Sequence, residues 1–153
     1  ICLMPCNLFG PNDNYDSQNS HFLPALIKKI YLASKKKKDN KIVKLWGTGK
    51  PLREVLYVDE VGDACEFFLK KETDSHLINI GSSTEKSIKE YAKKIRDKID
   101  PSIHIWFDNN KRLDGVKRKK LNLNLARNYG WKSKMNFDEA LDKTIKDFII
   151  EHL

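Results

Sequence analysis

The sequence predicts an α/β fold, in which short strands alternate with helices and parallel strands share a sheet. Two short apolar runs, at 1–4 and 77–81, have the composition of sheet strands. Between and after them, apolar residues recur at the spacing of helices. A chain of 153 residues with 40% hydrophobic content is long enough to bury a core. The run at 1–4 is typical of a buried central strand, so we expect earlier strands to be missing.

The first third of the chain is expected to hold that strand, a long loop and a helix. Residues 5–21 are rich in Asn, Asp, Pro and Ser, and a loop of this length is typical of a binding segment. The helix is predicted over 22–37, with Lys35 to Lys38 at its C-terminal end, where the helix dipole favours cations. Its apolar side is formed by Leu23, Leu26, Ile27, Ile30 and Tyr31.

The middle of the chain is expected to alternate strands with helices. Lys41–Trp46 and Glu54–Val58 are strand-like runs on either side of the turn Gly47–Pro51. Asp59 is predicted to cap a helix, and a strand is predicted over 76–81. The buried face of that helix is predicted to consist of Val61, Ala64, Cys65, Phe68 and Leu69.

The last part of the chain begins with a capping-box pattern, in which Glu90 follows Ser87 by three residues. The helix that it starts would bury Ile88, Tyr91, Ala92, Ile95 and Ile99. A short strand is predicted over 103–107 and an irregular loop over 108–120. Asn124 and Gly130 bracket a short helix, and Asn136 begins a terminal one.

Composition excludes several classes of protein. No stretch approaches the roughly 18 apolar residues of a membrane span, and no signal sequence is present, so we expect a cytoplasmic protein without a membrane partner. Cys2, Cys6 and Cys65 form an odd set without CxxC spacing, which argues against a disulfide framework and against a metal site. We expect the three cysteines to be reduced and Cys65 to lie in the core.

The net charge of +8 raises the question of nucleic acid. The basic clusters are Lys35 to Lys38 and Lys117 to Lys120, and no aromatic residues interleave with them as a stacking surface requires. We therefore predict no nucleic-acid partner and interpret the lysines as a solvated surface. Part of this charge could still serve an anionic small ligand.

Few residues have a local pattern that indicates chemistry. No GxGxxG loop is present to hold a dinucleotide pyrophosphate. Tyr31 and Lys35 have the Tyr-x-x-x-Lys spacing, but Tyr31 lies on the apolar stripe of the predicted helix, so core packing is favoured over catalysis. His21 ends a polar loop directly before a helix, and histidine is the side-chain type best suited to proton transfer at physiological pH, which makes it a candidate acid or base beside the alternative of a structural role.

Trp46 and Arg53 flank the predicted turn and leave two readings open. Trp46 could pack in the core or serve a ligand at the end of its strand. Arg53 could form a bidentate pair with a phosphate or a salt bridge with Asp or Glu.

Together these segments resemble the GDP-L-fucose synthase family, which is part of the extended short-chain dehydrogenase/reductase group. The resemblance covers the whole chain. It rests on the runs Met4–Asn14, Asn19–His21, Leu45–Glu54, Tyr57–Asp59, Asn79–Gly81, Phe107-Asp108, Asp114-Gly115 with Arg118-Lys119, and Gly130-Trp131.

The resemblance implies an NADP(H)-dependent enzyme that epimerises GDP-4-keto-6-deoxy-mannose at C3 and C5 and reduces its 4-keto group to give GDP-L-fucose. Residues 1–153 would be the C-terminal, mainly substrate-binding portion, with 1–8 and 77–81 as strands of the cofactor sheet. The N-terminal Rossmann half would be absent, with its phosphate loop, its Ser-Tyr-Lys set and the epimerisation cysteine. The fragment alone would be inactive, and the complete enzyme would be a homodimer.

The resemblance also implies roles for individual residues. Pro5, Cys6, Asn7 and Leu8 would line the nicotinamide end of the cofactor. His21 would touch the cofactor and act as the acid in epimerisation. The GDP-sugar would be held by Lys29, Trp46, Arg53 and Asp114.

The sequence departs from the family pattern at two places that bear on these implied roles. Cys6 stands where the family usually has Thr, and the loop 111–118 is one residue longer than usual and lacks prolines. The alternatives are another nucleotide-sugar epimerase or reductase, and a non-catalytic basic binding module.

Overall fold

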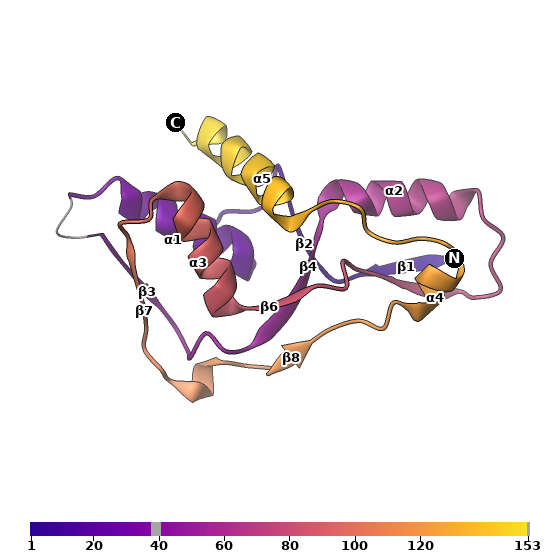
Figure 1. The fold of residues 1–153 in the computed structure, drawn as a ribbon, viewed down its shortest axis with the longest axis horizontal. Coiled ribbons are helices and arrows are strands. Elements are labelled where there is room, and N and C mark those ends of the chain that lie inside the picture. The colour runs from indigo at the N-terminus through magenta and orange to yellow at the C-terminus, as the bar shows by residue number, and fades with distance from the viewer. Residues whose placement is uncertain (38–40, 153) are drawn as a thin grey trace. The chain divides into compact units, whose positions relative to one another are not determined.

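The computed structural model describes residues 1–37 and 41–152, and in it strands alternate with helices (Figure 1). The predicted α/β class is confirmed. Lys38, in the predicted lysine run, and Leu153 lie outside the described residues. The elements in chain order are β1 (Cys2–Pro5), β2 (Asn7–Phe9), α1 (Phe22–Ser34), β3 (Ile42–Leu45), β4 (Leu52–Tyr57), α2 (Val58–Leu69), β5 (Leu77–Ile80), β6 (Glu85–Ser87), α3 (Ile88–Ile99), β7 (His104–Phe107), the 3-10 turn η2 (Lys111–Leu113), β8 (Arg118–Lys119), α4 (Asn124–Asn128) and α5 (Phe137–Glu151).

The chain divides into two compact units, each built from separate stretches of sequence. Unit 1 consists of 1–11, 53–85 and 119–153, and unit 2 of 12–52 and 86–118. Within the described residues, no helix is long and apolar enough to cross a membrane.

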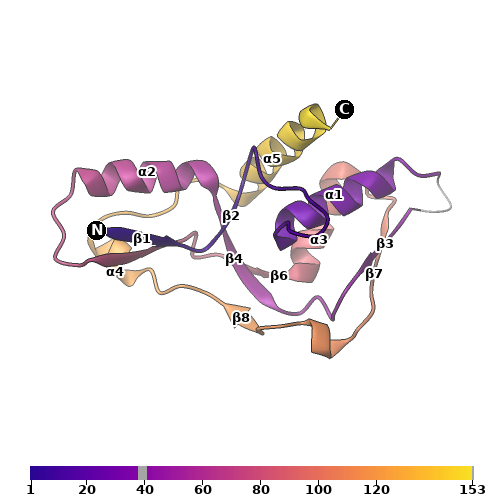
Figure 2. The ribbon, with the colours of Figure 1, turned by 180° about the vertical axis from the view of Figure 1, so that it is seen from behind.

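Unit 1 contains the two strands predicted over 1–4 and 77–81, which are β1 and β5. β1 pairs in parallel with β5, in a register that places Cys2 opposite Leu77 and Pro5 opposite Ile80. α2 runs alongside this pair (Figures 1 and 2). The core that they share with α4 and β4 consists of Leu56, Ala64, Phe68, Ile78, Ile80, Ala126 and Trp131.

β1 is not the buried strand that its composition predicts. Ile1 is 58% exposed, Met4 46% and Leu77, on the paired strand, 50%. Among the described residues β1 has a strand neighbour on one side only, because its sheet contains β1 and β5 alone. The inward-facing residues of the pair pack against α2, while alternate side chains face outward.

Unit 2 is built on a second parallel pair, β3 with β7, with Ile42 opposite His104 and Leu45 opposite Phe107. α1 and α3 lie side by side in both ribbon views. α3 begins at the predicted capping box, in which the Glu90 backbone N–H donates to Ser87 Oγ and the Ser87 N–H donates to Glu90. The buried residues of this unit include Leu23, Ile27, Ile30, Val43, Leu45, Tyr91 and Ile95.

α1 ends earlier than predicted, at Ser34, with Lys35 as its C-cap. No basic residue therefore lies in its last turn, and Lys35 to Lys37 cap and follow the helix instead of forming its predicted last turn. Tyr31 is buried, as predicted, and the Lys35 ammonium lies 4.7 Å from its ring centroid.

α2 also differs from its prediction. It begins at Val58 with Tyr57 as its N-cap, so Asp59 lies in the first turn instead of capping it. Cys65 is exposed and Leu69 is 84% exposed, so both are outside the predicted core. The buried residues of α2 are Glu60, Ala64 and Phe68. Cys65 and Leu69 each follow one of these residues directly, so they lie about 100° further around the helix and face solvent.

The two segments predicted to be irregular, 5–21 and 108–120, contain the short strands β2 and β8. β2, inside the predicted loop 5–21, pairs in parallel with β4, with Asn7 opposite Val55. β6 and β8 belong to the same sheet as β2 and β4. These strands are two or three residues long, which is too short for a periodic pattern.

Candidate functional site

The segment Pro5–Leu8 in unit 1 leads from the carboxyl end of β1 into β2. The Cys6 backbone N–H donates to the Ile80 carbonyl at 2.9 Å, and Asn7 Nδ2 donates to the Glu54 carbonyl at 2.8 Å. The segment is thus fixed to β5 and β4. In open sheets of parallel strands, ligands bind beyond the carboxyl ends of the strands, which is where this segment lies.

The thiol of Cys6 is neutral at physiological pH. Burial, aided by the negative charge of Glu54, raises its pKa to about 12. Pro5, Cys6 and Leu8 are partly buried and uncharged. They therefore fit the flat nicotinamide end of a dinucleotide cofactor, whereas the described sequence offers no Gly-rich loop for its pyrophosphate.

Glu54 is a structural residue that the sequence analysis did not identify. Its side chain is fully buried in β4 and accepts hydrogen bonds from the backbone N–H groups of Ser83 at 2.6 Å and Leu121 at 3.2 Å. A Cβ atom on Gly81, at the end of β5, would collide with the Glu54 carboxylate. An acidic residue inside an apolar strand was the available signal. Arg53 precedes it in β4 and is partly buried.

In unit 2, the loop before α1 is held by its own side chains. Asp16 Oδ1 accepts from the backbone N–H groups of Gln18 at 3.0 Å and Asn19 at 2.9 Å. Lys28 Nζ, on α1, donates to the Tyr15 carbonyl at 2.8 Å. The loop is irregular but ordered by these bonds, and it ends at His21.

His21 occupies the N-cap position of α1 with an exposed side chain that makes no capping hydrogen bond. Burial raises the pKa of the Asp13 carboxyl, and the Asn14 N–H and the positive charge of His21 lower it in part. His21 is therefore within electrostatic range of Asp13 and faces solvent. This exposure leaves its imidazole accessible for proton transfer.

Trp46 follows β3 and is 75% exposed, so the core alternative for this residue is wrong. The Lys29 ammonium of α1 lies 5.0 Å from its ring centroid. The pair combines an exposed aromatic face with a cation at the same place. Such a combination suits a ligand that carries both an aromatic ring and a negative charge.

Asp114 fixes the turn that follows Trp46. Its carboxylate accepts from Thr48 N and Thr48 Oγ1, each at 2.7 Å, and these hydrogen bonds hold the pKa of the carboxyl below its usual value. Gly47 has φ +75°, and a Cβ atom there would collide with the Asp114 carboxylate. Asp108 accepts from the Gly47 N–H at 2.8 Å. Asp114 therefore acts on the geometry around Trp46 through the turn.

The structure brings some predicted site residues together within each unit. In unit 1, the Asn7 side chain fixes Pro5–Leu8 to the Glu54 carbonyl of β4, the residue after Arg53. In unit 2, Lys29 contacts Trp46, and Asp114 holds the neighbouring turn. His21 also belongs to unit 2, where it occupies the N-cap position of α1, the helix that carries Lys29 further along.

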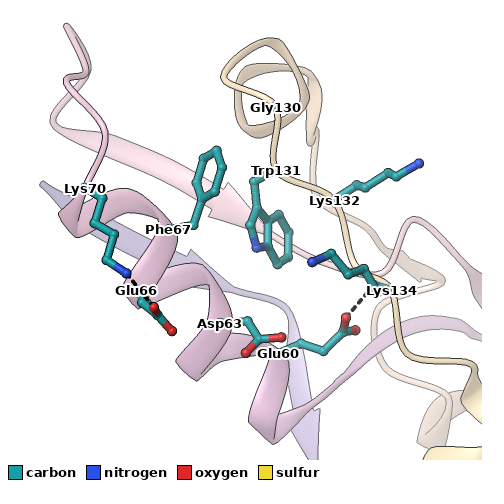
Figure 3. Close-up of a pocket in the computed structure, with 9 residues that line it drawn as sticks. All are labelled: Glu60, Asp63, Glu66, Phe67, Lys70, Gly130, Trp131, Lys132 and Lys134. Carbon is teal, nitrogen blue, oxygen red and sulfur yellow. Dashed lines mark hydrogen bonds and ion pairs between the residues drawn. The ribbon is translucent and has the colours of Figure 1, made fainter.

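A separate cavity of about 400 Å³ lies in unit 1 (Figure 3). None of the predicted site residues lines it. Its wall combines the aromatic rings of Phe67 and Trp131 with the Glu66–Lys70 ion pair, whose N–O distance is 2.6 Å. The buried Glu60 carboxylate accepts hydrogen bonds from the Ser133 hydroxyl and from the backbone N–H groups of Lys134 and Met135. In the part of the chain that the structure describes, no group of three His, Cys, Asp or Glu residues is placed to hold a metal ion.

Comparisons with known proteins give one consistent family. A family model described as NAD dependent epimerase/dehydratase family matches residues 1–81. The "Probable GDP-L-fucose synthase 1" of Oryza sativa subsp. japonica is 38% identical over 149 residues, which are 97% of this chain and 44% of the relative. The "GDP-L-colitose synthase" of Yersinia pseudotuberculosis is 32% identical over 149 residues, 97% of this chain and 47% of the relative.

The fold comparison agrees with the sequence comparison. The crystal structure of a GDP-L-fucose synthetase from Naegleria fowleri bound to NADP superposes with a TM-score of 0.83 at 28% identity. That match covers 98% of this chain and 45% of the other chain. The chain spans about half the length of the relatives it matches.

Proposed function

The chain belongs to the NAD dependent epimerase/dehydratase family, and from that membership we propose that it supplies the GDP-sugar site of an NADP-dependent GDP-L-fucose synthase. It is related to GDP-L-fucose synthases and has the α/β fold of the extended short-chain dehydrogenases/reductases. The observation that carries the proposal is the exposed Trp46 ring with the Lys29 ammonium 5.0 Å from its centroid. An indole beside a cation matches the base and the phosphates of a nucleotide.

In this proposal the chain is the C-terminal, substrate-binding portion of the enzyme. The absence of a Gly-rich phosphate loop from the sequence supports this assignment. The strands β1 and β5 would then belong to the cofactor sheet, and the chain alone would bind the GDP-sugar without turning it over. A cytoplasmic location and a homodimeric complete enzyme remain predictions.

The substrate would be GDP-4-keto-6-deoxy-D-mannose. Lys29 and Arg53 would neutralise its diphosphate, Trp46 would contact the nucleotide, and Asp114 would hold the turn beside it. The 4-keto group makes the protons at C3 and C5 acidic, so each centre can be inverted by removing a proton from one face and returning one to the other. His21 would return the proton, for which its exposed imidazole is available.

The nicotinamide end of NADPH would lie against Pro5–Leu8 and, when bound, would supply hydride to the C4 keto carbon. The role of this chain is to provide an uncharged wall there. The neutral thiol of Cys6 adds no negative charge beside the ring, and its backbone is already fixed to Ile80. His21 would also touch the cofactor.

A second candidate is the reaction of the GDP-L-colitose synthase that is 32% identical to this chain. Both candidates use a GDP-sugar, so the Trp46 and Lys29 site serves either. Comparing the complete enzyme on the GDP-sugar substrates of both reactions separates the two.

Calorimetric titration of the 153-residue chain with GDP, UDP and a single-stranded RNA oligomer tests the proposal. We expect GDP to bind more tightly than UDP. The Trp46→Leu substitution should lower the affinity of the chain for GDP at least tenfold. Leu69→Ala serves as a surface control, because Leu69 is 84% exposed on α2. Equal affinity for GDP and UDP, or tight binding of RNA without binding of GDP, would contradict the proposal and favour the other nucleotide-sugar enzymes or a basic binding module.

A further inference from the structure

The outward face of the β3–β7 pair in unit 2 is aromatic and basic. Along β3 and the residue after it, Ile42, Lys44 and Trp46 are exposed, while Val43 and Leu45 are buried. Along β7, His104 and Trp106 are exposed, and the Trp106 side chain is 52% accessible. Because alternate residues of a strand point to the same side, these five side chains share one face.

The two tryptophans on this face stand close to one another. Lys44 is directly opposite Trp106, and Trp46 is two residues further along. Backbone hydrogen bonds between the two segments continue past β3 on either side of Trp46, since Asp108 N donates to the Leu45 carbonyl at 3.1 Å and Asn109 N to the Gly47 carbonyl at 3.0 Å. With strands about 4.8 Å apart and a rise of about 3.3 Å per residue, the Cα atoms of the two tryptophans are about 8 Å apart.

That spacing suits a planar ring inserted between two indoles. A ring in van der Waals contact on both sides needs about 7 Å between its neighbours, twice a contact of about 3.5 Å. Each indole also has its own cation, because the Lys44 ammonium lies 6.0 Å from the Trp106 centroid and Lys29 lies over Trp46. The runs 41–46 and 104–107 contain no acidic residue, so this face favours an anionic ligand.

We propose that Trp106, with Lys44, forms a second stacking wall for the base of the nucleotide that Trp46 and Lys29 bind. This inference rests on the proposed nucleotide site at Trp46 and extends it to two residues of β3 and β7. The ligand class is a nucleoside diphosphate: its base lies against the indoles, and its phosphates pair with the lysines. The Trp106 ring itself then contributes to affinity for the base and nothing to affinity for the phosphates.

Tryptophan fluorescence of the 153-residue chain provides the test. The chain has three tryptophans, and Trp131 is only 6% exposed, so it adds a nearly constant background. We expect GDP to quench the emission of both Trp46→Leu and Trp106→Leu. Trp106→Leu should lower the affinity for GDP about tenfold, equivalent to about 1.4 kcal/mol. The affinity of the same variant for inorganic pyrophosphate should stay within twofold of that of the unchanged chain. Trp106→Tyr keeps an aromatic ring and should recover most of the GDP affinity.

Ile42→Ala is the matched control, because Ile42 lies on the same face and is 49% exposed without an aromatic ring. It should leave GDP affinity unchanged. If Trp46→Leu weakens GDP while Trp106→Leu has no effect, the second wall is wrong and the site at Trp46 stands. If the unchanged chain does not bind GDP, the proposed function itself fails. Equal weakening of GDP and pyrophosphate by Trp106→Leu, in a variant that melts like the unchanged chain, also overturns the stacking role.

Discussion

At the scale of single residues, local chemistry decides which groups of the candidate site can react. His21 is exposed and Cys6 is partly buried, although both lie in or beside the same long sequence run before α1. The first is available for proton transfer, whereas the second is held as a neutral thiol. Two predictions follow from this difference.

His21→Gln should impair epimerisation more than reduction. In the complete enzyme of our proposal, we expect proton exchange at C3 and C5 to fall about 100-fold, the lower range for a lost general acid. Reduction of an already epimerised keto-sugar should change only a few-fold. Deuterium incorporation from solvent and NADPH oxidation measure the two steps separately. His76→Gln, at an exposed histidine before β5, is the control, and equal losses in both steps for His21→Gln would refute its role.

Cys6 should resist alkylation while Cys2 and Cys65 react. A thiol whose pKa is about 12 is ionised in only about one molecule in 10⁴ at pH 8. Cys2 and Cys65 are exposed to solvent. Iodoacetamide labelling followed by peptide mass spectrometry should therefore modify these two first, with Cys6 at least 100-fold slower. Labelling of Cys6 at a similar rate in the folded chain would contradict the neutral, buried thiol.

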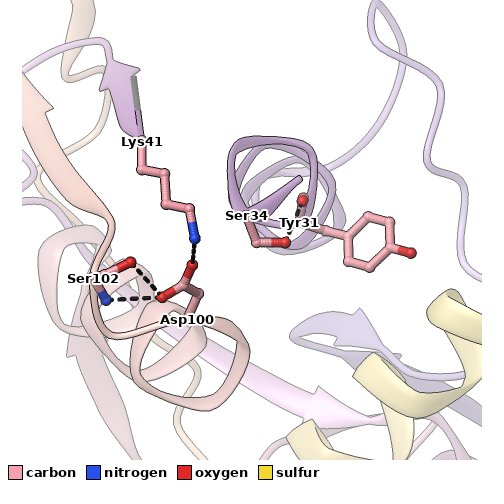
Figure 4. Close-up of polar contacts among 5 residues, drawn as sticks. All are labelled: Tyr31, Ser34, Lys41, Asp100 and Ser102. Atoms are coloured by element: carbon pink, nitrogen blue, oxygen red, sulfur yellow. Dashed lines mark hydrogen bonds and ion pairs between the residues drawn. The ribbon is translucent and has the colours of Figure 1, made fainter. Parts of the chain in front are cut away.

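At the scale of elements, the turn after β3 and the start of β3 are both fixed by carboxylates from distant parts of the chain. Asp114 and Asp108 hold the turn around Gly47, and Asp100 holds Lys41 (Figure 4). In each case the carboxylate comes from a residue about 60 positions further along the sequence.

Gly47→Ala should destabilise the chain and loosen the turn beside Trp46. The substitution places a Cβ against the Asp114 carboxylate at φ +75°, so we expect a loss of about 1–3 kcal/mol in the free energy of unfolding. Gly62→Ala is a matched control in α2, where nothing lies within 4 Å of the added atom. It should stabilise by about 0.5–1 kcal/mol, since alanine favours a helix over glycine. Urea denaturation measures both, and equal effects would contradict the strain at Gly47.

The Lys41–Asp100 pair should make stability depend on pH in the acid range. Its N–O distance is 2.6 Å, and the hydrogen bond from Lys41, with further ones from Ser102, lowers the pKa of Asp100 from 3.8 to about 2. Because the folded-state pKa is the lower one, the contribution is present above pH 3.8 and is lost as the pH falls through 2. Asp100→Asn should therefore melt lower at pH 6 and converge with the unchanged chain near pH 2. Asp63→Asn, an exposed aspartate of α2, is the control, and a constant difference between pH 6 and pH 2 would refute the linkage.

The elements also show what could be predicted from the sequence. The amphipathic helices and the capping box at Ser87 have strong local patterns, so α1, α3 and α5 were found with small errors at their ends. β2 was missed because three residues contain no period and its pairing with β4 is a contact across 48 positions. For the same reason, the bond from Thr48 to Asp114 and the burial of Glu54 had no local signal that fixes the partner.

At the scale of the whole molecule, single buried carboxylates join stretches that are far apart in sequence. Glu54 connects β4 with the segment after β5 and with Leu121 before α4, all within unit 1. Glu60 does the same for α2 and the segment before α5. These contacts join two of the three sequence stretches of unit 1, 53–85 and 119–153.

Glu54→Ala should destabilise unit 1 more than any substitution of an exposed carboxylate. The change leaves the partly buried Ser83 and Leu121 N–H groups without their Glu54 acceptor, at up to about 1–3 kcal/mol for each. Glu54→Gln retains one acceptor oxygen and should lose less. Hydrogen exchange of the amides of Ser83 and Leu121, together with urea denaturation, measures the effect. Unchanged exchange at both amides in Glu54→Ala would contradict the assigned hydrogen bonds.

The exposed apolar residues of β1 and β5 affect how readily copies of the chain associate with one another. Among the described residues β1 offers one unpaired strand edge, and Ile1, Met4 and Leu77 are about half exposed beside it. Such an edge attracts further strands at short range, whereas the net charge of +8 repels other copies over longer distances. Salt shortens the repulsion and leaves the attraction intact. The lysine-rich surface thus sets the ionic strength at which separate copies of the chain stay dispersed.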